Sequence, residues 1–317
     1  MTEVDRIPVA IIGAGVVGAA CARSIADRGG MGFIFEREAH SAPGTTSRNS
    51  GVIHAGIYYP PELLKAELCI AGNLAIYDWC EKHGVGCKSI GKMIVATTQG
   101  QEEGLADIFA NATASWEGRG DSQLEMLTRE QVLEMEPSLT DARCALWSPR
   151  TGIVDPHELT DSFLRVAEEG FEVLYHAEVT AIKTLDDGGF QLTSSRGEIQ
   201  ADVVINAAGL YSDVIAEHVG IEGRTIYPCK GDYWQWSAAG REFSHLVYPV
   251  KEKGAPGLGV HLTLDLAGRV RLGPNAYFVD SKEDFSPNEA GKEDFRKAAE
   301  VLFGAIPDDA MAYDMCG

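Results

Sequence analysis

The segment from residue 9 to residue 36 constrains the fold more than any other part of the chain. An apolar run leads into the glycine-rich turn GAGVVG at 13–18, a helical pattern follows, and a second apolar run ends at Glu36. This order of strand, glycine turn, helix, strand and acid is typical of a dinucleotide-binding βαβ unit. In such a unit Gly13 permits the tight turn, Gly15 lets the backbone approach a pyrophosphate, and Gly18 lets the helix pack close to the strand.

The helix that begins after Gly15 would offer its first-turn N–H groups to phosphates, because the helix dipole favours negative charge there. Glu36 lies 18 residues after Gly18, which places its carboxylate to accept hydrogen bonds from a ribose. The alternative is a glycine-rich turn that serves packing alone. The two apolar runs, the helix and the acid together favour dinucleotide binding.

Composition limits the partners of the chain. A formal net charge of −20 argues against nucleic acid or an anionic membrane as a general partner, although a local basic pocket could still bind a small anion. The seven cysteines are scattered without a CxxC pair, as expected of reduced thiols in a cytoplasmic protein. The apolar run near the N-terminus enters the glycine turn and is expected to be a strand rather than a signal peptide. No apolar run approaches the roughly 20 residues of a membrane span.

The 317 residues are enough for two domains. The predicted nucleotide fold starts, is interrupted, resumes near residue 152 and gives way to a β-rich block. We therefore predict an α/β plus α+β fold, in which a Rossmann-like domain is combined with a discontinuous antiparallel-sheet domain for substrate. The nucleotide-binding domain is expected over 1–83 and 151–220, and the substrate-binding domain over 84–150 and 221–317.

Two further segments could line a ligand. The loop TTSRNSGVIHAGIYY at 45–59 carries hydroxyls, an amide, a guanidinium and the imidazole of His54. It is either a solvated surface loop or a loop that follows the dinucleotide and presents His54 to a reacting centre. The run VVINAAG at 203–209 ends in small residues that would allow close approach to a flat ligand, or it is an ordinary strand-to-helix turn.

The β-rich block contributes candidate groups for binding an anion. Lys230, His261 and Arg271 could clamp carboxylates, Arg in a bidentate manner and Lys as a point charge. Taken singly, each could equally be a surface charge or a strand polar group with a partner in the protein. No HEXXH, paired CxxC or EF-hand pattern is present, so we predict no metal site. There is no GxSxG nucleophile elbow either.

Several motifs together resemble those of a known flavoenzyme family. They are the glycine turn with Glu36, the 45–59 loop, AELCIAGN (66–73), GKMIVAT (91–97), RTGIVD (150–155), VINAAGL (204–210), KGDYW (230–234) and GLGVHLTLDLAG with LGPNA (257–276). The resemblance covers nearly the whole chain. It is to the D-amino-acid-oxidase/glycerol-3-phosphate-dehydrogenase superfamily of flavin-dependent oxidoreductases, and within it to the branch of the L-2-hydroxyglutarate dehydrogenases and oxidases.

The resemblance implies FAD rather than NAD, so that the Rossmann-like domain would be an FAD-binding domain. It also implies an antiparallel substrate sheet over the isoalloxazine. The residues expected to hold FAD are Gly13, Ala14, Gly15, Val16, Gly18, Glu36, Arg37, Ser47, Arg48, Asn49, Ser50, Gly51, Val179, Ala208 and Gly209. In the family a further segment, which closes on the flavin, follows the stretch resembling YDMCG (313–317); this C-terminal FAD-closing segment is absent from the sequence.

The implied reaction is oxidation of an L-2-hydroxy acid, L-2-hydroxyglutarate first among them, to the 2-oxo acid by hydride transfer to the flavin. His54 is the preferred general base, because an imidazole titrates near neutral pH, and His261 is the second candidate. The residues expected to bind substrate are Tyr58, Lys230, Tyr248, Thr263 and Arg271. The electron acceptor is left open among oxygen, a quinone and an electron-transfer protein, and peripheral membrane association is not excluded.

Two alternatives remain open from the sequence. One is a related flavoenzyme that oxidises an amino acid or glycerol 3-phosphate. The other is a non-catalytic nucleotide-binding remnant.

Overall fold

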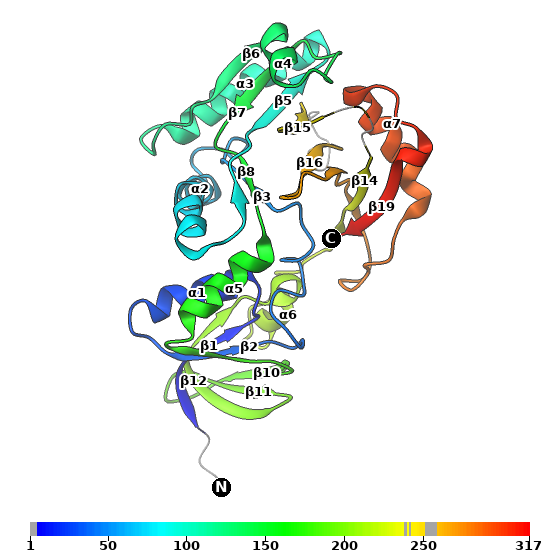
Figure 1. Ribbon diagram of the computed structural model, residues 1–317. Coiled ribbons are helices and arrows are strands. Elements are labelled where there is room, and N and C mark those ends of the chain that lie inside the picture. Colours follow the sequence, from blue (N-terminus) through cyan, green and yellow to red (C-terminus); the bar gives the residue numbers. More distant parts are fainter. Residues whose placement is uncertain (1–4, 238–239, 241, 251–258) are drawn as a thin grey trace. The chain divides into compact units, whose positions relative to one another are not determined.

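The computed structural model describes residues 5–237, 240, 242–250 and 259–317. The chain forms two compact units (Figure 1). Unit 1 comprises the chain up to Asn49 together with Pro156–Pro228 and Asp280–Lys282. Unit 2 comprises Ser50–Asp155, Cys229–Val279 and Glu283–Gly317. The start of the 257–276 motif lies outside the described residues.

Unit 1 contains three α-helices, one 3-10 turn and six strands among its described residues. In chain order they are β1 (Arg6–Ile12), α1 (Val16–Ala26), β2 (Gly32–Phe35), α5 (Pro156–Ala167), β9 (Phe171–Leu174), β10 (Val179–Thr184), β11 (Phe190–Ser194), β12 (Gly197–Asn206), η1 (Gly209–Tyr211) and α6 (Ser212–Glu217). The sheet order is β10-β11-β12-β1-β2-β9. Strands β12, β1, β2 and β9 run parallel, and β10 and β11 extend the sheet as an antiparallel meander. The predicted Rossmann-like βαβ domain is thereby confirmed.

Two apolar layers enclose this sheet. On one side, α1 and α5 pack through Ala19, Ala22 and Leu164 onto Ile11 and Ile34 of the central strands. Because the side chains of α1 on this face are small, the helix packs close to the strands, as predicted from Gly18. The other layer contains core residues of β10 to β12 and of α6.

Unit 2 contains four α-helices and thirteen strands among its described residues. In chain order its elements are β3 (Val52–Ile53), α2 (Leu64–His83), β4 (Cys87–Lys88), β5 (Lys92–Ala96), α3 (Gln99–Trp116), β6 (Glu125–Thr128), α4 (Arg129–Met135), β7 (Cys144–Ser148), β8 (Gly152–Val154), β13 (Cys229–Lys230), β14 (Asp232–Trp236), β15 (Leu246–Pro249), β16 (Leu262–Leu264), β17 (Val270–Leu272), β18 (Tyr277–Phe278), η2 (Glu289–Gly291), α7 (Lys292–Phe303), η3 (Asp308–Ala310) and β19 (Met311–Cys316).

The main sheet of unit 2 has the order β19-β14-β17-β16-β15-β5-β7-β6. Every neighbouring pair is antiparallel except β15 and β5, which run parallel. A three-stranded sheet, β3-β8-β4, and the short pair β13-β18 complete the unit. The predicted antiparallel-sheet second domain is thus present, with one parallel pair within it.

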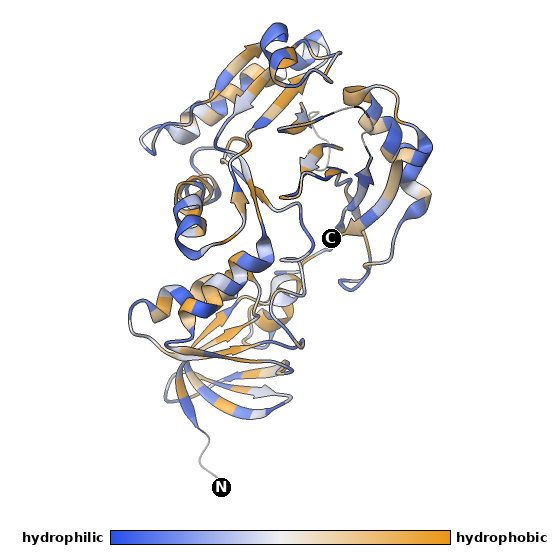
Figure 2. Cartoon of the chain, in the orientation of Figure 1, coloured by the Kyte–Doolittle hydropathy of each residue, from blue (hydrophilic) through white to orange (hydrophobic). Residues whose placement is uncertain are grey.

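Each face of the main sheet has its own core. Met93, Val247, Leu262 and Leu272 point to the face that α4 and α7 cover. Ile94, Leu146 and Tyr248 belong to the opposite face, with α3 and the segment that follows β3. Figure 2 shows hydrophobic residues concentrated in the strands of each unit, whereas the helices alternate between hydrophobic and hydrophilic positions.

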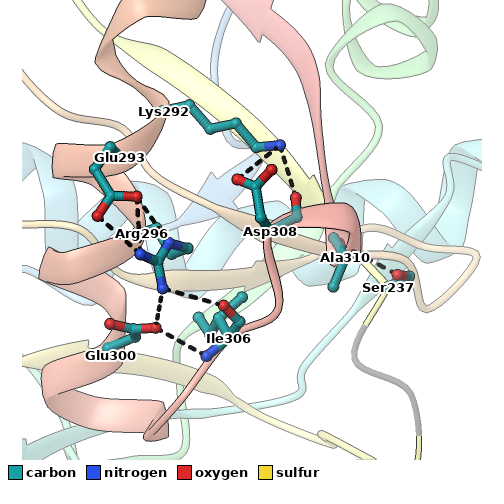
Figure 3. Close-up of polar contacts among 8 residues, drawn as sticks. All are labelled: Ser237, Lys292, Glu293, Arg296, Glu300, Ile306, Asp308 and Ala310. Atoms are coloured by element: carbon teal, nitrogen blue, oxygen red, sulfur yellow. Dashed lines mark hydrogen bonds and ion pairs between the residues drawn. The ribbon is translucent and has the colours of Figure 1, made fainter.

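Helix α7 is fastened to the segment before β19 by a network of charged groups (Figure 3). Arg296 binds Glu300 at 2.6 Å, and the same carboxylate accepts a hydrogen bond from the backbone N–H of Ile306 at 3.0 Å. Lys292 donates to the carbonyl of Asp308 at 2.7 Å. These contacts position β19, which pairs with β14 at the edge of the main sheet.

The domain boundaries differ from the expected ones. Residues 50–83 and 151–155 were expected in the nucleotide-binding domain, but they lie in unit 2. The reason is that β3 pairs with β8, and Ile70 of α2 is buried in the same core as Ile94 and Leu146. Residues 221–228 and 280–282 belong to unit 1 instead of the substrate-binding domain.

Candidate functional site

The glycine turn of unit 1 has the geometry that its spacing predicts. Gly13 adopts φ +103°, and a Cβ there would lie 2.4 Å from the carbonyl oxygen of Ala207. A Cβ on Gly18 would lie 2.0 Å from the carbonyl oxygen of Gly13. Both glycines are therefore required by backbone contacts within the protein.

Gly15 is different, because neither its conformation nor its packing calls for glycine. Its φ of −75° is open to any residue, and a Cβ would meet only the hydroxyl oxygen of Thr46, at 3.1 Å. Gly15 is the N-cap of α1 and supplies no side-chain cap, while the N–H of Val16 donates to Thr46 Oγ1 at 3.1 Å. This leaves space beside a helix N-terminus, the geometry in which a phosphate group fits.

Glu36 joins the end of β2 to the glycine turn. Its buried carboxylate accepts hydrogen bonds from the N–H of Ala14 at 2.9 Å and from the N–H of Glu38 at 3.0 Å. The next residue, Arg37, lies over the ring of Tyr211 with its guanidinium 4.4 Å from the ring centroid. The acid is therefore held beside the turn, as a ribose-binding group should be.

Other residues predicted to hold FAD lie in the 45–49 loop, just after β12 and at the start of β10. Asn49 donates to the carbonyls of Thr45 and Thr46 at 3.0 and 2.7 Å, which folds the 45–49 loop back on itself. Gly209 has φ +57°, and a Cβ on it would lie 3.9 Å from Thr45 Oγ1, so this loop and the end of β12 meet. Val179 is buried at the start of β10, two residues after Ala177, whose N–H donates to the carbonyl of Glu36 at 2.8 Å.

Unit 1 thus brings together most of the residues predicted to hold FAD. They are Gly13, Ala14, Gly15, Val16, Gly18, Glu36, Arg37, Ser47, Arg48, Asn49, Val179, Ala208 and Gly209. Ser50 and Gly51 instead begin unit 2: Ser50 contacts the hydroxyl of Tyr233 at 3.2 Å, and the carbonyl of Gly51 accepts the N–H of Val154 at 2.8 Å. The open helix N-terminus, the acid and the gap at Gly15 fit FAD.

A second candidate site lies on one face of the main sheet of unit 2. The register pairs Lys92 with Leu246, Val247 with Leu262, and Thr263 with Arg271. Because side chains alternate along each strand, Lys92, Tyr248, His261, Thr263 and Arg271 all lie on the same face. We call these five residues the polar row. The row crosses four neighbouring strands, β5, β15, β16 and β17.

His54 lies just after β3 and is held by its backbone. Its carbonyl accepts hydrogen bonds from Asn73 Nδ2 at 3.1 Å and from the Cys69 thiol at 3.6 Å. The imidazole keeps solvent access although protein atoms surround it. This desolvation, followed by the positive charges of Lys92 and Lys65, lowers the pKa of His54 to about 4. The side chain is therefore neutral at pH 7 and free to accept a proton.

His261 occupies a more enclosed position. Its ring is stacked on that of Tyr248, with centroids 3.8 Å apart, and its Nδ1–H donates to the carbonyl of Gly259 at 2.8 Å. Complete burial lowers the pKa of His261 to about 3. The Nδ1 of His261 is already engaged and its ring is covered by Tyr248, whereas His54 keeps solvent access, so the geometry favours His54 as the base.

The hydroxyl groups of Tyr58, Tyr248 and Thr263 also belong to the candidate site that contains His54 and His261. Burial raises the pKa values of Tyr58 and Tyr248, so both remain neutral hydroxyl groups at pH 7. The hydroxyl oxygens of Tyr58 and Thr263 are buried and have no hydrogen-bond partner within the described residues. Such groups are costly in a protein interior and are typical of a site whose ligand supplies the missing partners.

The two cations predicted to clamp carboxylates already have partners. Lys230 is buried on β13 and donates to Asp284 at 3.1 Å and to the carbonyl of Ser286 at 2.5 Å. Arg271 forms an ion pair with Asp314 at 2.5 Å. The structure therefore brings His54, Tyr58, Tyr248, Thr263 and His261 into one region of unit 2, whereas Lys230 is engaged elsewhere.

Lys92 is the residue that sequence reasoning missed. It opens β5, whose sequence is KMIVA, and every residue of that strand is buried. A lysine in an otherwise apolar, fully buried strand is unusual, because charged side chains are almost never fully buried without a partner. The contrast between Lys92 and the four apolar residues that follow it is the sequence signal that could have identified this residue.

Two other features are absent from the described part of the chain. No group of three or more His, Cys, Asp or Glu side chains there is arranged to hold a metal ion. None of the helices with assigned positions is long and apolar enough to cross a membrane.

Comparison with known proteins agrees with this geometry. The family model of FAD dependent oxidoreductases, DAO, matches residues 8–317. L-2-hydroxyglutarate dehydrogenase of Escherichia coli (strain K12) is 34% identical over 280 residues, which cover 87% of this chain and 65% of that protein. The mitochondrial L-2-hydroxyglutarate dehydrogenase of Homo sapiens is 35% identical over 299 residues, covering 88% and 63%. The chain thus spans a little under two thirds of the length of these relatives.

Solved structures share the fold. The L-alpha-glycerophosphate oxidase of Mycoplasma pneumoniae, with FAD bound, superposes with a TM-score of 0.89 at 22% identity, covering 99% of this chain and 83% of that one. Glycine oxidase of Geobacillus kaustophilus gives a TM-score of 0.79 at 24% identity, covering 99% and 82%. With the match over residues 8–317 and the glycine turn, acid and helix N-terminus that fit FAD, the chain belongs to the DAO family of FAD-dependent oxidoreductases.

Proposed function

We propose that this chain carries the catalytic machinery for oxidising an L-2-hydroxy acid to the 2-oxo acid, with L-2-hydroxyglutarate as the leading candidate. The observation that carries the proposal is His54, a solvent-accessible imidazole kept neutral at pH 7, in the same unit as the polar row. The relatives named L-2-hydroxyglutarate dehydrogenase supply the choice of substrate.

In this proposal bound FAD would supply the acceptor for the hydride that leaves the carbon bearing the hydroxyl group. His54 takes the proton of that hydroxyl, and the lone pair left on the oxygen forms the new carbonyl. A neutral imidazole is required at the start of this step, and the lowered pKa of His54 provides it. The neutral hydroxyls of Tyr58 and Tyr248 could donate hydrogen bonds to substrate oxygens.

The proposed roles of Lys230 and Arg271 in carboxylate binding require an exchange of partners. A substrate carboxylate would have to replace Asp284 at Lys230 or Asp314 at Arg271. If Arg271 makes that exchange, replacing it by alanine should weaken a dicarboxylate more than L-lactate, because only the dicarboxylate has a second carboxylate to bind.

A panel of electron donors tests the function. The FAD-loaded chain is mixed anaerobically with L-2-hydroxyglutarate, L-lactate, glycine, L-proline and glycerol 3-phosphate, and flavin absorbance is followed. Fastest bleaching by L-2-hydroxyglutarate supports the proposal. Bleaching only by an amine or by glycerol 3-phosphate would assign the chain to a different reaction of the family, and a flavin that no donor bleaches would favour a nucleotide-binding remnant.

A further inference from the structure

Lys92 is a buried amine without a hydrogen-bond partner. Its side chain is fully inaccessible to solvent, and Nζ has no donor–acceptor contact with any described group. The amine lies over two aromatic faces, 4.8 Å from the ring centroid of Tyr58 and 4.7 Å from that of Tyr248. Ring faces attract a cation, but they accept no conventional hydrogen bond and carry no net charge.

Among the described residues, the groups around Lys92 give it no counter-charge. His54 and His261 interact with it and are neutral at pH 7, since their pKa values are lowered. Cys69 is a neutral thiol there because burial raises its pKa, and Tyr58 and Tyr248 are neutral phenols. Lys65, the other charge that acts on His54, is itself a cation. Although the whole chain carries −20, this region is locally deficient in negative charge.

Burial consequently lowers the pKa of Lys92 to about 7. A methionine of similar length would fill the same space in the strand KMIVA without that penalty. A costly, unpartnered amine beside the candidate base is therefore more readily explained by a ligand than by stability.

We propose that Lys92 Nζ receives the substrate carboxylate next to the hydroxyl-bearing carbon, and that carboxylate binding places a proton on the amine. This inference rests on the proposed function for the identity of the substrate, but not for the presence of a carboxylate site. Tyr58 and Thr263, whose buried hydroxyls lack partners, are suited to donate to the same anion.

The arrangement also connects binding to proton transfer. The positive charge of Lys92 is one of the causes that lower the pKa of His54. Because carboxylate binding brings a proton to the amine, the resulting ion pair carries no net charge. Substrate binding therefore adds no net positive charge beside His54 and leaves its imidazole neutral for proton transfer.

Calorimetric titration with glutarate, a dicarboxylate without a hydroxyl group, tests the site without turnover. The FAD-loaded chain is titrated at pH 7.5 in two buffers of different ionisation enthalpy, which gives both affinity and protons taken up. A pKa of about 7 for the free amine leaves it mostly neutral at this pH, so binding should take up about 0.8 proton.

Two variants of Lys92 and one control variant show whether glutarate binding and proton uptake depend on this amine. Lys92→Met should bind glutarate at least about tenfold more weakly and take up no proton, because the cation is lost. Lys92→Arg, which is always charged, should bind without proton uptake. Lys297→Met removes an exposed lysine, paired with Glu293 at 3.4 Å, and should match the wild type. If Lys92→Met does not fold, the absence of proton uptake in Lys92→Arg still tests the proposal.

Wild-type affinity and proton uptake in Lys92→Met, or proton uptake in Lys92→Arg, would overturn the inference. Unchanged glutarate affinity combined with loss of flavin reduction by L-2-hydroxyglutarate would also overturn it, and would make the amine a proton acceptor instead. Glutarate binding that depends on Lys92, in a chain whose flavin no hydroxy acid bleaches, would leave the carboxylate site standing and refute the proposed function.

Discussion

Replacing Lys92 by methionine should stabilise the folded chain at neutral pH and remove a pH dependence that the wild type shows. In the unfolded chain the amine has its ordinary pKa of 10.5, whereas burial lowers the pKa to about 7 in the folded chain. Between these values the unfolded state binds more protons, so the free energy of unfolding rises with pH. The shift corresponds to about 5 kcal/mol over the whole window, or about 1.4 kcal/mol per pH unit.

Urea unfolding followed by tryptophan fluorescence measures this directly. All five tryptophans of the chain lie in unit 2, so the signal reports the unit that contains Lys92. The FAD-free wild type and Lys92→Met are compared at pH 7, 8, 9 and 10. The variant's advantage should be largest at pH 7 and should shrink steadily toward pH 10. Ionisation of other groups affects both proteins and cancels in the difference.

A difference that stays constant from pH 7 to 10 would refute the reasoning, because it would mean that the folded chain does not disfavour the charged amine. Lys297→Met is the control and should change stability by less than about 0.5 kcal/mol at every pH, as expected for an exposed ion pair.

Two further substitutions test the packing on which the sites depend. Gly18→Ala would place a Cβ 2.0 Å from the carbonyl oxygen of Gly13, so it should abolish FAD retention on gel filtration; Gly72→Ala, where a Cβ meets nothing within 4 Å, should retain FAD fully. Glu136→Ala removes a buried carboxylate that binds His245 Nδ1 at 2.7 Å, and should lower the urea-derived stability of unit 2 by about 3 kcal/mol; a loss below about 1 kcal/mol would show that water replaces the carboxylate.

Local sequence signals predicted the nucleotide-binding half well, because its constraints act within a few residues. The glycine turn, Glu36 and the first helix are set by strand–turn–helix spacing, and the structure places all three as expected. Helix α4 of unit 2 is also fixed by local contacts: the side chain of Thr128 accepts the N–H of Gln131, and the side chain of Gln131 accepts the N–H of Thr128.

The second site depends on contacts between distant residues, which the sequence does not reveal directly. Lys230 was expected to be free for a ligand, but Asp284, 54 residues later, binds it. Strand β19 is defined by its pairing with β14, more than 70 residues earlier in the chain. Lys92 and Tyr248 become neighbours only because β5 and β15 pair in parallel. The boundary at Ser50 likewise follows from the pairing of β3 with β8.

The central claim is that His54 accepts the hydroxyl proton of a 2-hydroxy acid while the hydride goes to FAD. Stopped-flow measurement of flavin reduction by saturating L-2-hydroxyglutarate, in the wild type and in His54→Asn, tests it most directly. We expect a loss of about 10²–10⁴-fold in the variant at pH 7, as is typical for removal of a general base. The wild-type rate should fall with acid only below the ordinary histidine pKa of 6.5, because the pKa of His54 is lowered. A variant that reduces flavin at the wild-type rate, with the same pH profile, would contradict the account.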